Sequence, residues 1–173
     1  YPLRYPDDVD ADLTRRAGGG AASGQVVYVS GRVLDVRGDP VANARIEIWQ
    51  ANAQGRYTHP RDRNPAPIDP NFDGYARIDT DGEGRYRFKT IKPGAYAVSS
   101  NWTRPPHIHF IVRGRKNQLV TQMYFPGDPL NDKDPLLQNA WARDSLIAQV
   151  LTKEGEVEAG AQSMGWDVVL VQG

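Results

Sequence analysis

The 173-residue sequence contains no cysteine, which excludes disulfide bonds, thiolate metal ligands and cysteine nucleophiles. No apolar run approaches the roughly 18 residues that a membrane-spanning helix needs. Lysine and arginine number 21, as do aspartate and glutamate, so the net charge is zero and gives no general attraction to nucleic acid. We therefore expect neither a membrane nor a nucleic acid as a partner.

A lack of cysteine suits a reducing and an oxidising compartment equally well, so it does not indicate where the protein works. The sequence starts at Tyr1 and not at a methionine. A removed export signal is one interpretation of that start. The compartment is left open at this point.

Histidine is scarce as well: there are three, and two of them, His107 and His109, are two positions apart. Side chains alternate between the two faces of a strand, so both imidazoles would project to one side. The apolar Ile108 and Phe110 would then project into a core. Backbones roughly 7 Å apart would place the two rings within reach of one shared metal ion.

Alternating apolar residues and frequent glycine and proline turns predict many short strands and few helices. Only 144–151 has apolar residues at helical spacing behind a capping residue. The long polar segment 55–73 is expected to be a functional loop. The pattern predicts an all-β protein, an antiparallel two-sheet β-sandwich with long active-site loops and at most one or two short helices. The expected strands are 25–33, 44–51, 75–80 and 86–88 as a hairpin, 118–125 and 166–172, with the stretch 94–112 as the central strand.

Two histidines do not complete a metal site, so further ligands must come from elsewhere. His59 is the remaining histidine, and a hard, highly charged ion would prefer anionic oxygen. A tyrosine phenol holds its proton until about pH 10 unless a bound cation displaces it. The residues alone do not select the ligands from the eight tyrosines.

Several segments, in order along the chain, resemble the intradiol ring-cleavage dioxygenases, with the protocatechuate 3,4-dioxygenases as the most similar group. The resemblance starts near Asp10 and extends to the C-terminal strand, so 25–173 would be the catalytic domain and 1–24 an N-terminal arm. The segments that carry it are IEIWQANAQGRYTH, APIDPNF, TIKPGAY, RPPHIHF and TQMYFPGDP.

The resemblance implies a mononuclear non-haem Fe(III) held by Tyr57, Tyr96, His107 and His109. Two phenolates and a hydroxide would balance the charge of the ferric ion, which avoids an uncompensated interior charge. His59 is then expected to be a loop residue near the site and not a ligand.

The implied reaction cleaves a catechol between its two hydroxyl-bearing carbons, incorporates both atoms of O2 and yields a cis,cis-muconate-type diacid. Tyr96 would accept a proton from the substrate. Arg104 would stabilise negative charge on the ring, and Gln122 would help to position it. Trp49 and Val98 would bind the substrate at the pocket wall. Protocatechuate enzymes commonly have an aromatic residue where this chain has Val98, so the ring substituent is not fixed.

The resemblance also implies a catechol-type small molecule and O2 as partners, self-association or association with a related subunit, and a slight preference for the cytoplasm. Two other interpretations remain open. Residues 31–48 resemble the start of transthyretin-like β-sandwich modules, which bind and do not catalyse. Alternatively, His107 and His109 would hold zinc or copper.

Overall fold

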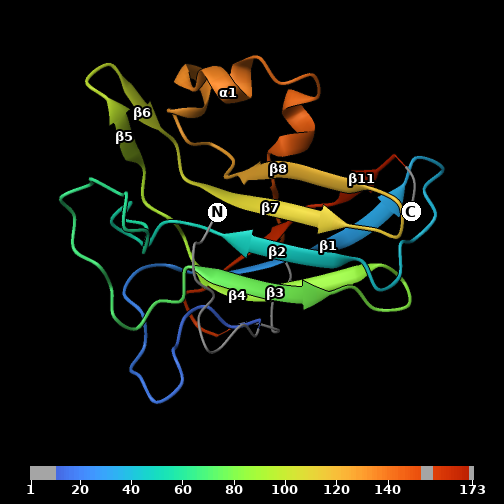
Figure 1. The fold of residues 1–173 in the computed structure, drawn as a ribbon, viewed down its shortest axis with the longest axis horizontal. Coiled ribbons are helices and arrows are strands. Elements are labelled where there is room, and N and C mark those ends of the chain that lie inside the picture. The colour runs from blue at the N-terminus through green and yellow to red at the C-terminus, as the bar shows by residue number, and fades with distance from the viewer. Residues whose placement is uncertain (1–10, 153–157, 172–173) are drawn as a thin grey trace.

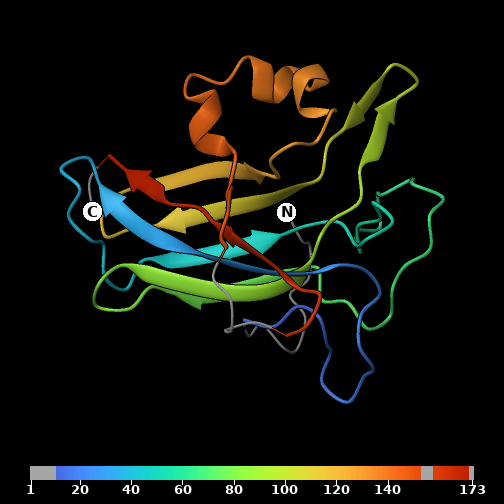
Figure 2. The same ribbon diagram turned by 180° about the vertical axis from the view of Figure 1, so that it is seen from behind.

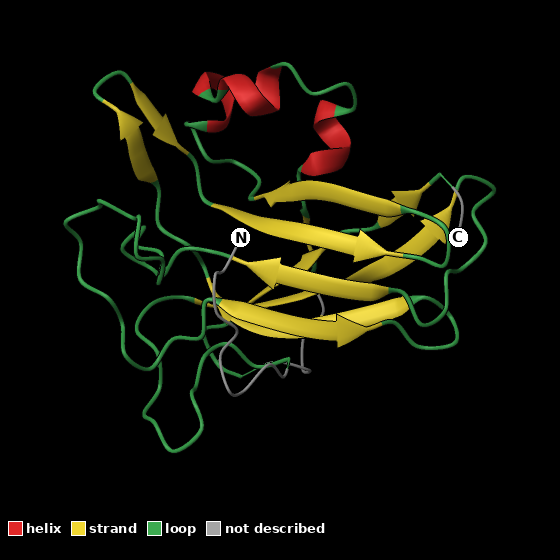
Figure 3. Cartoon of the chain, viewed as in Figure 1, coloured by secondary structure: helices red, strands yellow, loops and turns green. Residues whose placement is uncertain are grey.

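The computed structural model describes residues 11–152 and 158–171, and residue 10 with the rest of the start of the expected arm lies outside them. Two β-sheets pack face to face; a small hairpin projects at one end, and a helical segment lies along one side, drawn at the top in Figures 1 and 3. This confirms the expected two-sheet β-sandwich. No helix in the described ranges is long and apolar enough to cross a bilayer.

The first sheet is built on the long strand β1 (Val26–Asp35). Strand β4 (Arg85–Ile91) pairs with it in antiparallel fashion along one edge. On the other edge, β10 (Gln162–Gly165) and then β11 (Val168–Leu170) pair with β1 in parallel, and β9 (Gln149–Val150) extends β10. The two parallel pairings differ from the expected all-antiparallel arrangement. Figure 2 shows the strands of this sheet from behind.

The second sheet carries the site and is antiparallel throughout, in the order β3, β2, β7, β8. Its strands are β3 (Tyr75–Asp79), β2 (Arg45–Trp49), β7 (His107–Arg113) and β8 (Gln118–Tyr124). The register aligns Trp49 with His109, and His109 with Gln122. These three residues therefore form one row across the outer face of the sheet.

The core lies between the two sheets and is filled by alternate residues of their strands. Val27 and Val29 of β1 meet Ile48 of β2 and Phe110 of β7, and all four side chains are fully buried. The ring of Phe110 also packs 4.7 Å from that of Trp166. Apolar alternation thus turns one face of each sheet inward and leaves the other face free for polar residues.

The expected hairpin of 75–80 and 86–88 is wrong, because β3 and β4 pair with different sheets. The Asp81 to Gly84 turn is present, and the Arg85 amide donates to Asp81. This turn carries the chain from one layer of the sandwich to the other. Turn residues in a sequence predict that the chain reverses direction, but they do not predict which strand the following segment pairs with.

The helix expected over 144–151 is also wrong. The chain forms a short 3-10 helix, η2 (Arg143–Leu146), and then enters β9. The helical segment begins earlier, with η1 (Asn131–Lys133) and α1 (Pro135–Gln138). It covers the end of β8, where Tyr124 bridges to Ile147. Leu137 of α1 is fully buried.

The central stretch is broken into three strands where one was expected. β5 (Tyr96–Ser99) and β6 (Trp102–Arg104) form a separate hairpin, and β7 follows after Pro105 and Pro106. Tyr96 pairs with Arg104 across this hairpin. The two prolines cannot donate ladder hydrogen bonds, which explains why pairing stops there.

Gly31 of β1 should tolerate no side chain. A Cβ there would collide with the backbone carbonyl of Trp166, which also accepts a hydrogen bond from the buried Tyr86 hydroxyl. We expect Gly31→Ala to lower the free energy of unfolding by about 1–3 kcal/mol, as overpacking does. Gly82→Ala is the matched control, because a Cβ at Gly82 meets open space. Equal stability of the two variants in urea unfolding would contradict this packing.

Candidate metal centre

Strand β7 presents the two histidines as the sequence predicts. Ile108 and Phe110 are fully buried in the core, while His107 and His109 lie on the opposite face of the strand. Their Nε2 atoms are 3.2 Å apart. Because one face of β7 is locked into the core, the direction of both imidazoles is fixed by the fold.

Two glycines bring the tyrosines to the histidines. Gly55 has φ of +79°, and any side chain there would collide with the carbonyl of Ala95. A side chain at Gly94 would likewise collide with the carbonyl of Ala53, and the Gly94 amide donates to the carbonyl of Asn52. The segments that lead to Tyr57 and Tyr96 therefore pass in backbone contact, which only glycine permits.

The loop around Tyr57 is held by polar contacts. The Tyr57 amide donates to Asp62 at 2.7 Å, and the Asn64 side chain donates to the carbonyl of Gly55 at 2.8 Å. The side-chain amide of Asn52 donates to the carbonyl of Pro67 at 2.9 Å, and its oxygen accepts from the Arg56 amide. The long segment is thus an ordered loop that fixes one tyrosine.

The four predicted ligands converge. Tyr57 Oη lies 3.2 Å from His109 Nε2, and Tyr96 Oη lies 3.5 Å from His107 Nε2. The two phenol rings meet edge to face with centroids 5.4 Å apart. Ligands about 2 Å from one shared ion lie roughly 3 Å from each other. The spacing of these four atoms therefore fits a single metal ion.

The protonation of the histidines also suits a metal. His107 Nδ1 lies 2.7 Å from the carbonyl of Pro105, so Nδ1 carries the proton and Nε2 keeps its lone pair. Burial, aided by the charge of Arg104, lowers the pKa of His107 to about 4. Burial and then His107 lower the pKa of His109 to about 2. Both imidazoles are therefore neutral at neutral pH.

Tyr57 fits a strongly charged cation. Burial, with the neighbouring Tyr96 as the next cause, raises the pKa of Tyr57 well above its ordinary value. The phenol therefore keeps its proton until a cation displaces it. Within residues 11–152 and 158–171, no three His, Cys, Asp or Glu side chains cluster to hold a metal. The candidate centre therefore combines the two histidines with the phenol oxygens of Tyr57 and Tyr96.

Arg104 and Gln122 lie beside these ligands, in contact with each other. The Arg104 guanidinium donates to Gln122 Oε1 at 2.6 Å and lies 3.1 Å from His107 Nε2. Sequence reasoning missed two further partners: Arg104 also donates to the Tyr124 hydroxyl at 2.7 Å and to Asp134 at 3.0 Å. Burial acts to lower the pKa of Arg104, but Asp134 and the nearby tyrosines outweigh it and raise it.

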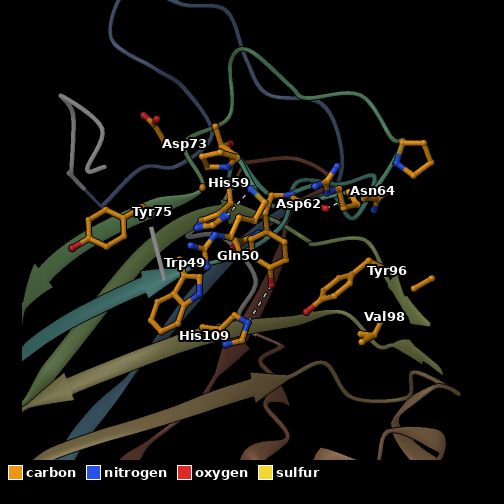
Figure 4. A pocket seen from close by; sticks show the side chains of 18 of the residues that line it. Trp49, Gln50, His59, Asp62, Asn64, Asp73, Tyr75, Tyr96, Val98 and His109 are labelled. Carbon is orange, nitrogen blue, oxygen red and sulfur yellow. Dashed lines mark hydrogen bonds between the residues drawn. The ribbon is translucent and has the colours of Figure 1, made fainter. Parts of the chain in front are cut away.

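An open cleft of about 1270 Å³ leads to this point from solvent. Tyr96, His109 and Trp49 line its floor, and Val98 lies at one wall (Figure 4). Trp49 stacks parallel on His109 with centroids 4.8 Å apart, so it braces a predicted ligand as well as lining the cleft. His59 also lines the cleft, and its Nδ1 accepts from the Arg61 amide.

The chain belongs to the dioxygenase family, whose model matches residues 4–172. Within that family its relatives are the intradiol enzymes. The chain is 50% identical over 169 residues to the protocatechuate 3,4-dioxygenase beta chain of Burkholderia cepacia, a match that covers 94% of this chain and 72% of that protein. The expected family is therefore confirmed.

More distant similarities are seen in sequence and in structure. The hydroxyquinol 1,2-dioxygenase of Rhizobium sp. (strain MTP-10005) is 34% identical over 139 residues, which cover 72% of this chain but only 45% of that protein. The crystal structure of 3-chlorocatechol 1,2-dioxygenase from Rhodococcus opacus 1CP superposes with a TM-score of 0.75 at 24% identity. It covers 98% of this chain and 68% of the other.

The lowered histidine pKa values predict a stability change in the metal-free protein. The unfolded chain protonates histidine near pH 6.5, whereas the folded protein does so only near pH 4 for His107 and pH 2 for His109. Below pH 6.5 the unfolded state thus binds more protons, and stability falls as the pH falls. Urea unfolding from about pH 7 to about pH 4.5 would measure this slope.

The matched variant is His109→Gln, which removes one of the two titrating imidazoles. Its loss of stability over the same pH interval should be smaller than that of the unmodified protein. A pH slope that is identical in the two proteins would show that His109 is protonated at its ordinary pKa in the folded state.

Proposed function

We propose that this protein is an intradiol dioxygenase that cleaves a protocatechuate-like diol at a mononuclear non-haem Fe(III) ion held by Tyr57, Tyr96, His107 and His109. The observation that carries the proposal is the convergence of two phenol oxygens and two imidazole nitrogens at the floor of one cleft. Family membership argues against the non-catalytic transthyretin-like interpretation. Two phenol oxygens among four ligands favour a hard ferric ion over zinc or copper.

Bound Fe(III) would supply the Lewis acidity that ionises a catechol and prepares its ring for attack by O2. Tyr96, ionised as a ligand of the iron, would accept the proton of one substrate hydroxyl; it lies on the short hairpin and lines the open cleft. Arg104 and Gln122 orient the ring at the reacting carbon. The charge of the buried Arg104 and the hydrogen bonds of both side chains would act where negative charge develops on the ring.

A carboxylate on the substrate ring would suit the outer cleft. Arg61 and Arg63 are exposed side chains of the 55–73 loop that line it. Small Val98 leaves the opposite wall open. The similarity to a beta chain further supports association with a related subunit, and contact between such chains would narrow a cleft that is wide for a single aromatic ring.

Removal of one phenol oxygen tests the metal centre. Tyrosinate bound to ferric iron absorbs visible light, so the iron-loaded protein should be red. Tyr57→Phe should weaken and shift that band and lower ring cleavage by at least about 100-fold, because one anionic ligand is lost. Tyr28→Phe is the control, since Tyr28 lies on β1, in the other sheet. An unchanged spectrum in Tyr57→Phe would contradict its role as a ligand.

The arginines of the loop test the substrate class. Arg61→Ala combined with Arg63→Ala should raise KM for protocatechuate several-fold and leave KM for unsubstituted catechol nearly unchanged, because only the first carries a carboxylate. Oxygen uptake measures both constants. An equal rise in KM for the two diols would show that these arginines do not read the ring substituent. No cleavage of either diol by the unmodified, iron-loaded protein would overturn the proposed function itself.

A further inference from the structure

We propose that Asp134 is a positioning residue that aims Arg104 at the substrate and cancels its charge beside the metal ligands, an inference that rests on the proposed function. Asp134 has no solvent exposure, and its ion pair with Arg104 has side chains only 0% and 5% exposed. It comes from the helical segment, remote in sequence from the strands that bear the ligands.

Both oxygens of Asp134 are fully used. Oδ2 accepts from Arg104 and from the Tyr124 hydroxyl, each at 3.0 Å. Oδ1 accepts from the indole of Trp102 and from the amide of Leu136, each at 3.3 Å. The carboxylate thereby joins the β5–β6 hairpin, β8 and α1 around one guanidinium. Arg104 itself donates to Gln122, Tyr124 and Asp134, so it cannot rotate away without breaking these hydrogen bonds.

The charge of Asp134 matters more than its shape. Arg104 lies 3.1 Å from His107 Nε2, where an uncompensated buried cation would oppose a metal ion. A buried ion pair that loses one partner leaves a charge with neither water nor a counterion. With Asp134 present, the pair adds no net charge, so the guanidinium can approach the ring without repelling the metal.

A simpler role for Asp134 would be to cap α1, since it is the N-cap residue and Pro135 follows it. Asparagine caps a helix about as well as aspartate does. With its amide oxygen in the place of Oδ1, Asp134→Asn therefore keeps the cap, and it removes the charge together with the two hydrogen bonds that Oδ2 accepts from Arg104 and Tyr124. It separates the two roles, because a cap residue would be nearly indifferent to this change.

The experiment is a double-mutant cycle between Asp134→Asn and Arg104→Gln, measured as steady-state ring cleavage of protocatechuate by the iron-loaded protein. Asp134→Asn alone should lower kcat about 10–100-fold with little change in KM, as loss of an outer partner in a metal site does. The double variant should be no slower than Arg104→Gln alone, because Asp134 acts through Arg104. If the reductions in kcat of the two single variants multiply in the double variant, the proposal is overturned.

The same double-mutant cycle can be measured on the iron-free protein through its melting temperature, which does not depend on enzymatic activity. Asp134→Asn should lower the melting temperature by several degrees, and adding Arg104→Gln should restore part of that loss, because the buried charge is then gone. Additive losses would show that Asp134 does not act through Arg104. Coupling here with no ring cleavage by the unmodified protein would count against the proposed function and not against the ion pair.

Asp132→Asn is the matched control. Asp132 lies two residues away in the same segment, is exposed, and accepts only from Arg143 at 2.7 Å in the described structure. Its loss should leave kcat, KM and the melting temperature close to those of the unmodified protein. A defect in Asp132→Asn as large as that in Asp134→Asn would mean that any charge change in this segment disturbs the site, and it would also overturn the proposal.

Discussion

The two faces of β7 are the constraint on which the rest of the site depends. Its apolar side chains are fixed in the core by contacts from both sheets, and this leaves His107 and His109 no freedom to turn away. The strand register then sets Trp49 and Gln122 in line with His109. The hydrophobic core and the candidate metal site are thus two results of one alternating pattern, so a change in the packing of the core would also move the two histidines.

Around β7, each buried charge is matched by an opposite charge that lies next to it. The phenols of Tyr57 and Tyr96 face neutral imidazoles, and the buried Arg104 is matched by the buried Asp134. The surrounding structure can therefore remain apolar without stranding an ion in its interior. A net charge of zero for the sequence says nothing about this arrangement, which depends on which opposite charges meet.

The sequence correctly predicted features that depend on neighbouring residues, such as strand alternation, and features carried by the family motifs. Alternation located β7 and the core faces of β1 and β2, and the order of the motifs indicated the family. It failed where an outcome depends on distant partners. The Asp81 to Gly84 turn is equally suitable for a hairpin and for a crossing between layers, and the apolar residues of 144–151 fit a helix or a strand. Asp134 followed by Pro135 signals a helix start, but nothing local indicates its buried ion pair with Arg104.

The parallel pairing of β1 has a consequence for the order in which the protein can assemble. The Arg32 amide donates to Asp167, 135 residues later, while the sheet that carries the site draws its strands from the middle of the chain. A ribosome delivers the four site strands well before it releases β10 and β11. During synthesis, the unpaired edge of β1 is therefore exposed to other nascent chains until the last strands arrive, a period of vulnerability imposed by topology alone.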